Sequence, residues 1–493
     1  MKPKFAIGLA TRNNLDYLKL MLKSAWFFKS NKLDLEFFIY LDGCTDGTKD
    51  YLTKLKNSTW FKFPIHIEEN NTDERMGITR ATNRVMKMID KSGIDKFYLV
   101  HSDMIFGPNW DWEIYKLIKS KRLVCATRVE PPIFPAESCK VHYKKWTFPK
   151  DFKWYDWITW LVLHTRLKRK YNHLPTKGCF APYAGLTKEW MKYGVDENLA
   201  KQSNEECSLF YEMLQDGFTF LQSWKTFVFH FGGRGNRFAK NNVQTYTEEW
   251  IKTNKKSVKN FIRKWGQDPI MDEWSFPILI NPQPKKKLSF VSLISTTENL
   301  YNFIEYNEPW FDELILVVDS SKVKVKEVKE IVKEYIENNK DHYYFDPKKI
   351  KVFSRKLNKN FAAQRNFGQS KAKYSFIFHL DQDEMIPIEM LRILRQLANA
   401  NKKIKVIGFA RKNIVDGKDT GVFPDYQFRF VHKSVKFVNK VHEVPEQIKK
   451  KNTKTVAVMP QNLFVFHVKT KETYNKQQEF YDKIKKGAGG TRL

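Results

Sequence analysis

The chain has 493 residues, which suggests two to four domains at roughly 100–200 residues per domain. Hydrophobic residues make up 42% of it and aromatic residues 15%, so it can build sizeable cores and is not a wholly disordered protein. The formal net charge of +31 favours anionic partners such as nucleic acid, an acidic membrane surface or phosphorylated substrates. Lysines spread along the chain are equally consistent with an ordinary solvated surface.

The cysteines and the apolar segments bear on where the protein works. Its five cysteines form no CxxC pair, which favours reduced thiols in the cytosol over a disulfide framework or a zinc site. The N-terminal apolar run is too short for a signal peptide, and no stretch approaches the ~20 apolar residues that span a bilayer. We therefore expect a cytoplasmic protein without a transmembrane segment, at most in contact with a membrane surface.

Short apolar runs alternate with helical patterns in the first half of the chain. FAIGLA (5–10) precedes a helical pattern at 15–28, FFIYLD (37–42) precedes one at 77–90, and KFYLVHSD (96–103) follows. This alternation is typical of βαβ units and predicts an α/β fold with a mostly parallel sheet.

The same plan restarts after a segment rich in proline and lysine. LSFVSLIS (288–295) and LILVVD (314–319) resemble the first two runs, NFAAQRNFGQSKAK (360–373) takes the place of the second helical pattern, and SFIFHLDQDE (375–384) matches the third run. Four elements recur in one order, which predicts an internal duplication. The expected organisation is a first domain over 1–276, a linker over 277–287, a second domain over 288–475 and a basic flexible tail over 476–493.

A Trp-rich segment at 152–171 ends in a basic cluster and stands apart from this plan. It is consistent with an interfacial membrane helix, with a wall of an acceptor site, or with a helix that packs aromatic side chains onto a core. The sequence leaves these alternatives open.

Ligands bind beyond the carboxyl ends of parallel strands, where Asp42 and Asp103 fall. The segments LDGCTDGT (41–48) and GITRATNRV (77–85) resemble the D-D-G-S-T-D-G-T and G-x-x-x-A-R-N-x-G motifs of the family 2 glycosyltransferases, which have the GT-A fold. The resemblance implies that Asp42 contacts the nucleoside of a nucleotide-sugar donor. It also implies that Arg80 and Asn83 line the donor site.

In this family the third strand ends in D-x-D, a metal-binding signature, and here it reads HSD. The resemblance implies that Asp103 holds Mn²⁺ or Mg²⁺, with His101 in place of the first carboxylate. VFHFGGRG (228–235) resembles a late segment of the family, and His230 is a further candidate ligand. Hard cations take carboxylate oxygens, and imidazole can join them.

The family's catalytic base is the Asp of an E-D pair at the start of a helix. Glu206 takes this position here and is preceded by Glu205. The resemblance implies that Glu206 accepts the proton of the acceptor hydroxyl. An acidic pair in a first turn is also favoured by the helix dipole alone, so a structural role stays open.

The second half resembles a branch of the same family that glycosylates lipopolysaccharide cores. The matching segments are NFAAQRNFG (360–368), FHLDQDE (378–384), PDYQFRF (424–430) and VHE (441–443). An intact D-x-D lies within the second of these segments. The resemblance implies a metal held by Asp381 and Asp383, donor contacts from Arg365, Asn366 and Arg429, a nucleoside contact from Asp319, and either Asp425 or Glu443 as the base.

These observations predict two tandem GT-A domains. Each would move a sugar from a nucleotide donor, for which we expect a UDP-sugar, to the hydroxyl of a glycan or glycolipid acceptor, with inversion. The two domains are expected to add successive sugars to one glycan. One alternative is a glycosyltransferase acting on modified bases in DNA, which the positive charge would suit. Another is a non-catalytic protein, derived from a transferase, that binds glycans or nucleic acid.

Overall fold

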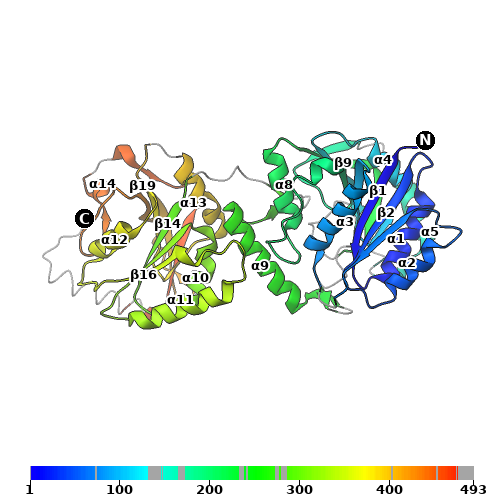
Figure 1. Ribbon diagram of the computed structural model, residues 1–493. Coiled ribbons are helices and arrows are strands. Elements are labelled where there is room, and N and C mark those ends of the chain that lie inside the picture. The colour runs from blue at the N-terminus through cyan, green and yellow to red at the C-terminus, as the bar shows by residue number, and fades with distance from the viewer. Residues whose placement is uncertain are drawn as a thin grey trace. The chain divides into compact units, whose positions relative to one another are not determined.

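The chain divides by its internal contacts into two units in a computed structural model (Figure 1). The first unit comprises Met1–Val258 and Pro269–Pro282, and the second comprises Lys259–Asp268 and Gln283–Leu493. Most of the predicted linker and the predicted tail lie outside the described residues. The structure describes residues 2–72, 75–131, 146, 148–164, 172–232, 238–239, 242–271, 277–278, 286–400, 403–450, 453–472 and 475.

The first unit is built on one mixed sheet with the strand order β3-β2-β1-β4-β8-β6-β9-β5, and β7 pairs with β9. Strands β3, β2, β1 and β4 run parallel, β4 and β8 pair antiparallel, and β6 and β9 pair parallel. The strands are β1 (Lys4–Thr11), β2 (Asp34–Leu41), β3 (Ile65–Glu69), β4 (Lys96–Leu99), β5 (Met104–Phe106), β6 (Arg122–Val129), β7 (His173–Thr176), β8 (Tyr183–Leu186) and β9 (Thr219–His230).

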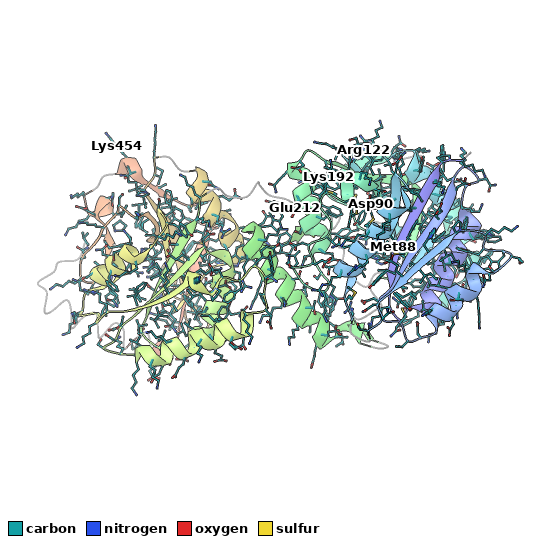
Figure 2. The ribbon with its side chains drawn as sticks, in the orientation of Figure 1. Met88, Asp90, Arg122, Lys192, Glu212 and Lys454 are labelled. Carbon is teal, nitrogen blue, oxygen red and sulfur yellow. The ribbon has the colours of Figure 1, made fainter. Side chains whose placement is uncertain are left out.

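Helices complete the first unit because their apolar faces match the apolar strands. Helix α3 buries Ala81, Val85 and Ile89 at a spacing of four residues, which places all three on one face. Figure 2 marks this helix by Met88 and Asp90 and the start of β6 by Arg122. The helices are α1 (Leu15–Phe28), α2 (Thr48–Lys56), α3 (Ile78–Ser92), α4 (Trp110–Tyr115), α5 (Trp154–Leu163), α7 (Thr187–Trp190) and α8 (Glu205–Gln215). Helix α9 (Glu248–Trp265) belongs to the first unit up to Val258 and to the second from Lys259.

The second unit repeats this strand order as β16-β15-β14-β17-β21-β19-β25-β18, with β20 and β24 also paired to β19. Its first four strands are again β-α-β units, because the apolar runs and helical patterns recur. The strands are β14 (Leu288–Ile294), β15 (Glu313–Val318), β16 (Ile350–Ser354), β17 (Phe376–His379), β18 (Glu384–Met385), β19 (Val406–Val415), β20 (Lys418–Asp419), β21 (Asp425–His432), β24 (Val456–Val458) and β25 (Phe464–Lys469).

Within the described residues, five helices lie wholly in the second unit, and short strand pairs lie outside both large sheets. The helices are α10 (Leu300–Asn307), α11 (Val325–Asn339), α12 (Phe361–Lys371), α13 (Ile388–Ala400) and α14 (Glu446–Lys449). The short pairs are β10 (Phe238–Ala239) with β11 (Asn242–Tyr246), β12 (Ile270–Met271) with β13 (Pro277–Ile278), and β22 (Phe437–Val438) with β23 (Val444–Pro445).

A glycine lets one helix approach the first strand closely in each unit. In the first unit the glycine is Gly8 on β1, where a Cβ atom would lie 2.6 Å from Cγ1 of Val85 on α3. In the second unit it is Gly368 on α12, where a Cβ atom would lie 2.6 Å from Cγ1 of Val291 on β14. Both units therefore pair a glycine with a valine at this contact, but the glycine lies on the strand in the first unit and on the helix in the second. This shared contact supports the predicted duplication.

The predicted fold class is confirmed: the chain is α/β, with two successive mixed sheets whose first strands are parallel. The described part of the Trp-rich segment forms α5, whose inner face buries Trp157 and Trp160. The indole N–H of Trp157 donates to the carbonyl of Phe106 (2.9 Å). The alternative of aromatic packing on a core is therefore confirmed for this face. None of the helices in the described part of the chain has the length and apolar character needed to cross a bilayer.

Candidate functional site

Two histidines and one aspartate meet beyond the parallel strands of the first unit. His101 and Asp103 lie in the turn between β4 and β5, and His230 is the last residue of β9. Their ligand atoms all lie within 4.8 Å of one another. The pairing of β5 with β9 sets Met104 opposite His230, which brings the histidine to the turn. Two imidazoles and a carboxylate fit a divalent transition metal such as Mn²⁺.

A buried glutamate orients the third member of this set. Oε1 of Glu130 lies 2.7 Å from Nδ1 of His230, and Nε2 of His230 lies 3.4 Å from Oδ1 of Asp103. Burial alone would lower the pKa of His230, but the two carboxylates outweigh it and raise the pKa to about 9. Burial would likewise raise the pKa of Asp103, but His230 holds it well below its usual range. No sequence motif marks Glu130, which follows directly after β6.

The acidic pair predicted to supply the base begins α8. Burial, and to a lesser extent the neighbouring carboxylate of Glu205, raise the pKa of Glu206 to about 8. Arg128 and His230 act on the Glu206 carboxylate in the opposite sense. A carboxyl group whose pKa lies near neutral pH is suited to general acid–base chemistry.

Asp42 lies where the sequence predicts it, and its carboxylate holds the loop before α3. The backbone N–H groups of Met76 and Gly77 donate to it at 2.8 and 3.0 Å, and Nδ2 of Asn70 donates at 3.3 Å. Because the buried carboxylate accepts these three hydrogen bonds, Asp42 positions the loops at the ends of the strands. A hollow of about 180 Å³ opens beside it, lined by Leu41, Gly43, Cys44, Lys49, Glu69, Asn70, Asn71 and Thr72.

Asn83 and Asn366 hold the same kind of contact in the two units. Asn83 donates to the carbonyl of Val195 (2.9 Å) and accepts from its N–H (3.0 Å). Asn366 donates to the carbonyl of Phe437 (2.8 Å) and accepts from its N–H (2.9 Å). Both amide groups therefore position a distant segment of the chain.

This match makes Thr82 the counterpart of Arg365, because each precedes the shared asparagine. Arg80, the predicted donor contact, is 55% exposed in its side chain and pairs with Glu197 at 3.5 Å. The first unit therefore has a threonine at the position of the family's arginine, and the predicted role of Arg80 stays a prediction.

In the second unit, arginines hold the first carboxylate of the D-x-D segment. Nη2 of Arg365 donates to both oxygens of Asp381 (2.9 and 2.8 Å), and its Nε donates to Glu443 (2.6 Å). Nη2 of Arg429 donates to Asp381 (2.8 Å) and to Glu384 (3.1 Å). These guanidinium groups hold the pKa of Asp381 well below its usual range, although burial opposes them.

The second carboxylate of the D-x-D segment also has cationic neighbours. Oδ2 of Asp383 lies 2.9 Å from Nζ of Lys469 and 3.3 Å from Nε2 of His467. Burial opposes the lowering of the pKa of Asp383, which these neighbours bring to about 2. In the described part of the chain, only His101, Asp103 and His230 form a group of three ligands that could hold a metal. The metal role predicted for Asp381 and Asp383 stays a prediction. With arginine and lysine side chains against them, these two carboxylates do not fit a divalent metal ion as they are arranged in the structure.

Arginines also hold both candidate bases of the second unit. Nε and Nη2 of Arg411 donate to Oδ2 of Asp425 (3.0 and 2.7 Å), and Arg365 holds Glu443. Burial would raise the pKa of Asp425, but Arg411 lowers it. The choice between the two carboxylates stays open.

Asp319 occupies the strand end that corresponds to Asp42. Its Oδ1 accepts from the backbone N–H and the hydroxyl of Ser321 (3.1 and 2.6 Å) and from the backbone N–H of Leu357 (3.1 Å). Asp319 therefore joins the ends of β15 and β16, as Asp42 joins the ends of β2 and β3. Its predicted nucleoside contact stays a prediction.

Comparisons with known proteins bear on the second unit most directly. No curated protein matches the sequence. A solved structure of TarS from S. aureus is 16% identical, with a TM-score of 0.33, and the match covers 47% of this chain and 36% of that one. A solved structure of GalNAc-T7 with UDP, GalNAc and Mn²⁺ is 12% identical, with a TM-score of 0.35, and the match covers 53% and 48%. The chain thus spans less than half of either protein. Residues 294–461 of the second unit match the family model described as Glycosyl transferase family 2, which supports glycosyl transfer.

Proposed function

We propose that the chain is an inverting glycosyltransferase that moves a sugar from a nucleotide-sugar donor, such as a UDP-sugar, to the hydroxyl of a glycan or glycoconjugate. The family 2 match over residues 294–461 supports the reaction class. The observation that carries the proposal for the first unit is the group of His101, Asp103 and His230, which lies beyond the parallel strands with an acidic helix start in the same unit. The branch that glycosylates lipopolysaccharide cores stays a prediction.

In the first unit, His101, Asp103 and His230 would hold a divalent cation. When bound, such a cation stabilises the negative charge of a departing diphosphate. Glu130 contacts Nδ1 of His230 and so leaves Nε2 facing Asp103. Glu206 would accept the proton of the acceptor hydroxyl, because its raised pKa makes it a competent base near neutral pH.

A surface of the first unit supports contact with an anionic membrane. On α5, Tyr155, Val162 and Leu163 are 78%, 63% and 66% exposed, although the opposite face of the helix is packed. Phe27 of α1 is 58% exposed, and its ring centroid lies 6.3 Å from that of Trp154. We call these four side chains of α5 and α1 the exposed apolar patch. Exposed Lys23 and Lys153 flank it. Aromatic and aliphatic side chains bordered by lysines suit an anionic lipid surface.

Vesicle sedimentation tests this contact. The wild-type chain should sediment with vesicles that contain anionic lipid, and the double substitution Val162→Asp/Leu163→Asp should abolish this. Val422→Asp provides a matched control, because Val422 is 62% exposed in the second unit. Equal sedimentation of all three proteins would refute the contact.

The catalytic proposal is tested by nucleotide release from a panel of nucleotide sugars in the presence of Mn²⁺. We expect one donor to be turned over, and Asp103→Ala to abolish the Mn²⁺-dependent part. The double substitution Asp381→Ala/Asp383→Ala shows how much the second unit contributes. Unchanged turnover in Asp103→Ala would remove the first unit from the proposal, and no turnover of any donor would favour a binding protein.

A further inference from the structure

The two polar sites can be compared residue by residue, because the strand registers coincide. Met104 pairs with His230 in the first unit, and Glu384 pairs with His467 in the second. Met104 and Glu384 are each preceded by an aspartate. Asp103 and Asp383 are therefore equivalent, and so are the two histidines.

The second nitrogen of each histidine confirms this equivalence. In the first unit, the parallel pairing of β6 with β9 ends one residue before Glu130 and His230, and their side chains are 2.7 Å apart. In the second unit, Asn413 pairs with His467 in register, and Oδ1 of Asn413 lies 2.7 Å from Nδ1 of the histidine. Each site thus has an aspartate, a histidine and a residue that orients the histidine.

The sites differ two positions after the histidine. The first unit has Gly232 there, and the second has Lys469. The lysine side chain is 2% exposed, and its Nζ lies 2.9 Å from Oδ2 of Asp383. An ammonium group therefore lies against the aspartate that corresponds to the predicted metal ligand of the first unit.

The arginines of the second unit are also absent from equivalent positions of the first. Leu99 pairs with Tyr183, and the register of β17 with β21 puts Arg429 in the corresponding place. Tyr183 and Thr82 thus stand where the second unit has Arg429 and Arg365. Among the described residues, the buried atoms Nη1 of Arg365 and Nε of Arg429 have no hydrogen-bond partner. Buried N–H donors of this kind suit an anion.

We infer that the second unit works without a divalent cation, and that Lys469, together with Arg365 and Arg429, supplies the positive charge for the diphosphate of a nucleotide ligand. A cation that bound Asp383 would have to displace the buried ammonium group of Lys469 from that carboxylate. A lysine is a compact point charge that can neutralise phosphate oxygens. This inference rests on the proposed function, because it names how the second site would hold the same class of donor.

Mn²⁺ binding to the full chain, followed by electron paramagnetic resonance, tests the first part. We expect one bound Mn²⁺ per chain, which is lost in Asp103→Asn and kept in Asp383→Asn. Two bound ions, or loss of the ion in Asp383→Asn, would overturn the inference. If the wild-type chain bound no Mn²⁺, this would count against the metal centre proposed for the first unit and not against the second.

Lys469→Met decides the inference independently, because it removes the charge and keeps most of the apolar side chain. It should add one Mn²⁺ site per chain, and Lys469→Arg should add none. A folded Lys469→Met chain, checked by its unfolding transition, that gained no site would contradict the proposed role of the ammonium group.

UDP binding in EDTA tests the ligand. In an Asp103→Asn chain, calorimetry should still detect UDP, and the additional change Lys469→Met should weaken its binding at least about tenfold, or 1.4 kcal/mol. Absence of binding in EDTA would overturn the second unit as a diphosphate site. It would leave the first unit, tested with Mn²⁺ in the wild-type chain, unaffected.

Discussion

The two units hold different polar sites on one strand order and one register. The first unit places two histidines and an aspartate together. It has Thr82 and Tyr183 where the second unit has Arg365 and Arg429. In the second, Arg365 and Arg429 form a connected set of ion pairs with three carboxylates, and Lys469 pairs separately with Asp383. Since the strand order and the pairing at these positions are shared, the difference between the two sites lies in the side chains that occupy them.

The comparison teaches that a buried charged residue and its oppositely charged partners are present together in one unit and absent together from the other. Arg365 and Arg429 both contact Asp381. The first unit has Thr82, Tyr183 and His101 at the three corresponding positions. An aspartate there without its arginines, or the reverse, would leave an uncompensated buried charge, which is strongly destabilising. A fold therefore determines where a site lies, and the charge balance within the site determines its chemistry.

The largest expected effect is on the rate of sugar transfer when the candidate base of the first unit is removed. Glu206→Gln should lower the rate of sugar transfer by about 10²–10⁴-fold, because the amide cannot accept the acceptor proton. Steady-state kinetics with the active donor measures this. Glu212→Gln, on the same helix, is the matched control and should change the rate less than about twofold. If Glu443→Gln abolished transfer and Glu206→Gln did not, the second unit would be the catalytic one.

A charge removed from the second unit should destabilise that unit alone. Asp381→Asn leaves Arg365 and Arg429 buried without their shared carboxylate, so we expect a loss of about 3–5 kcal/mol. Hydrogen exchange of peptides from α12 and β17 reports the loss locally. His101→Asn, at the equivalent position of the first unit, is the control and should cost less than about 1 kcal/mol. Similar costs would show that the ion pairs do not distinguish the units.

The raised pKa of Glu206 gives the first unit a pH dependence that a rate profile can detect. A base must be deprotonated to act, and burial raises the pKa of Glu206 to about 8. The value of kcat/KM should therefore rise about tenfold per pH unit below pH 8 and level off above it. A pH–rate profile measures this, and a profile that is flat between pH 6 and 8 would contradict the assignment of Glu206.

Periodicity and motif order predicted the strands and helices well, because apolar runs and helical faces are local properties of the sequence. The runs at 5–10, 37–42, 288–295 and 314–319 fall within or at the ends of β1, β2, β14 and β15. The turn residues His101 and Asp103 were within reach of motif matching for the same reason. The third run is shorter in the structure, since β4 ends at Leu99 and leaves the polar turn outside the strand.

The partners contributed by late strands could not be predicted in the same way. Glu130, His467 and Lys469 reach their sites only through the pairing of strands that are far apart in sequence. His467, for example, follows Asp383 by more than eighty residues, and the register of β18 with β25 alone joins them. A search for a second histidine at the duplicated position of His230 was the available signal. The ion pairs of Asp381 carried none, because a D-x-D segment does not show which cations surround it.

The smallest expected effect concerns what the units share. Asn83→Ala and Asn366→Ala each remove two hydrogen bonds to a distant backbone segment, at Val195 and at Phe437. Each substitution leaves buried backbone groups unpaired, so each should destabilise its own unit by about 1–3 kcal/mol. Hydrogen exchange in α3 and α12 measures both, and Asn338→Ala on the exposed side of α11 should stay within about 0.5 kcal/mol. If one asparagine proved neutral, the common frame would hold its site by different contacts in the two units, and the equivalence of Thr82 with Arg365 would lose its support.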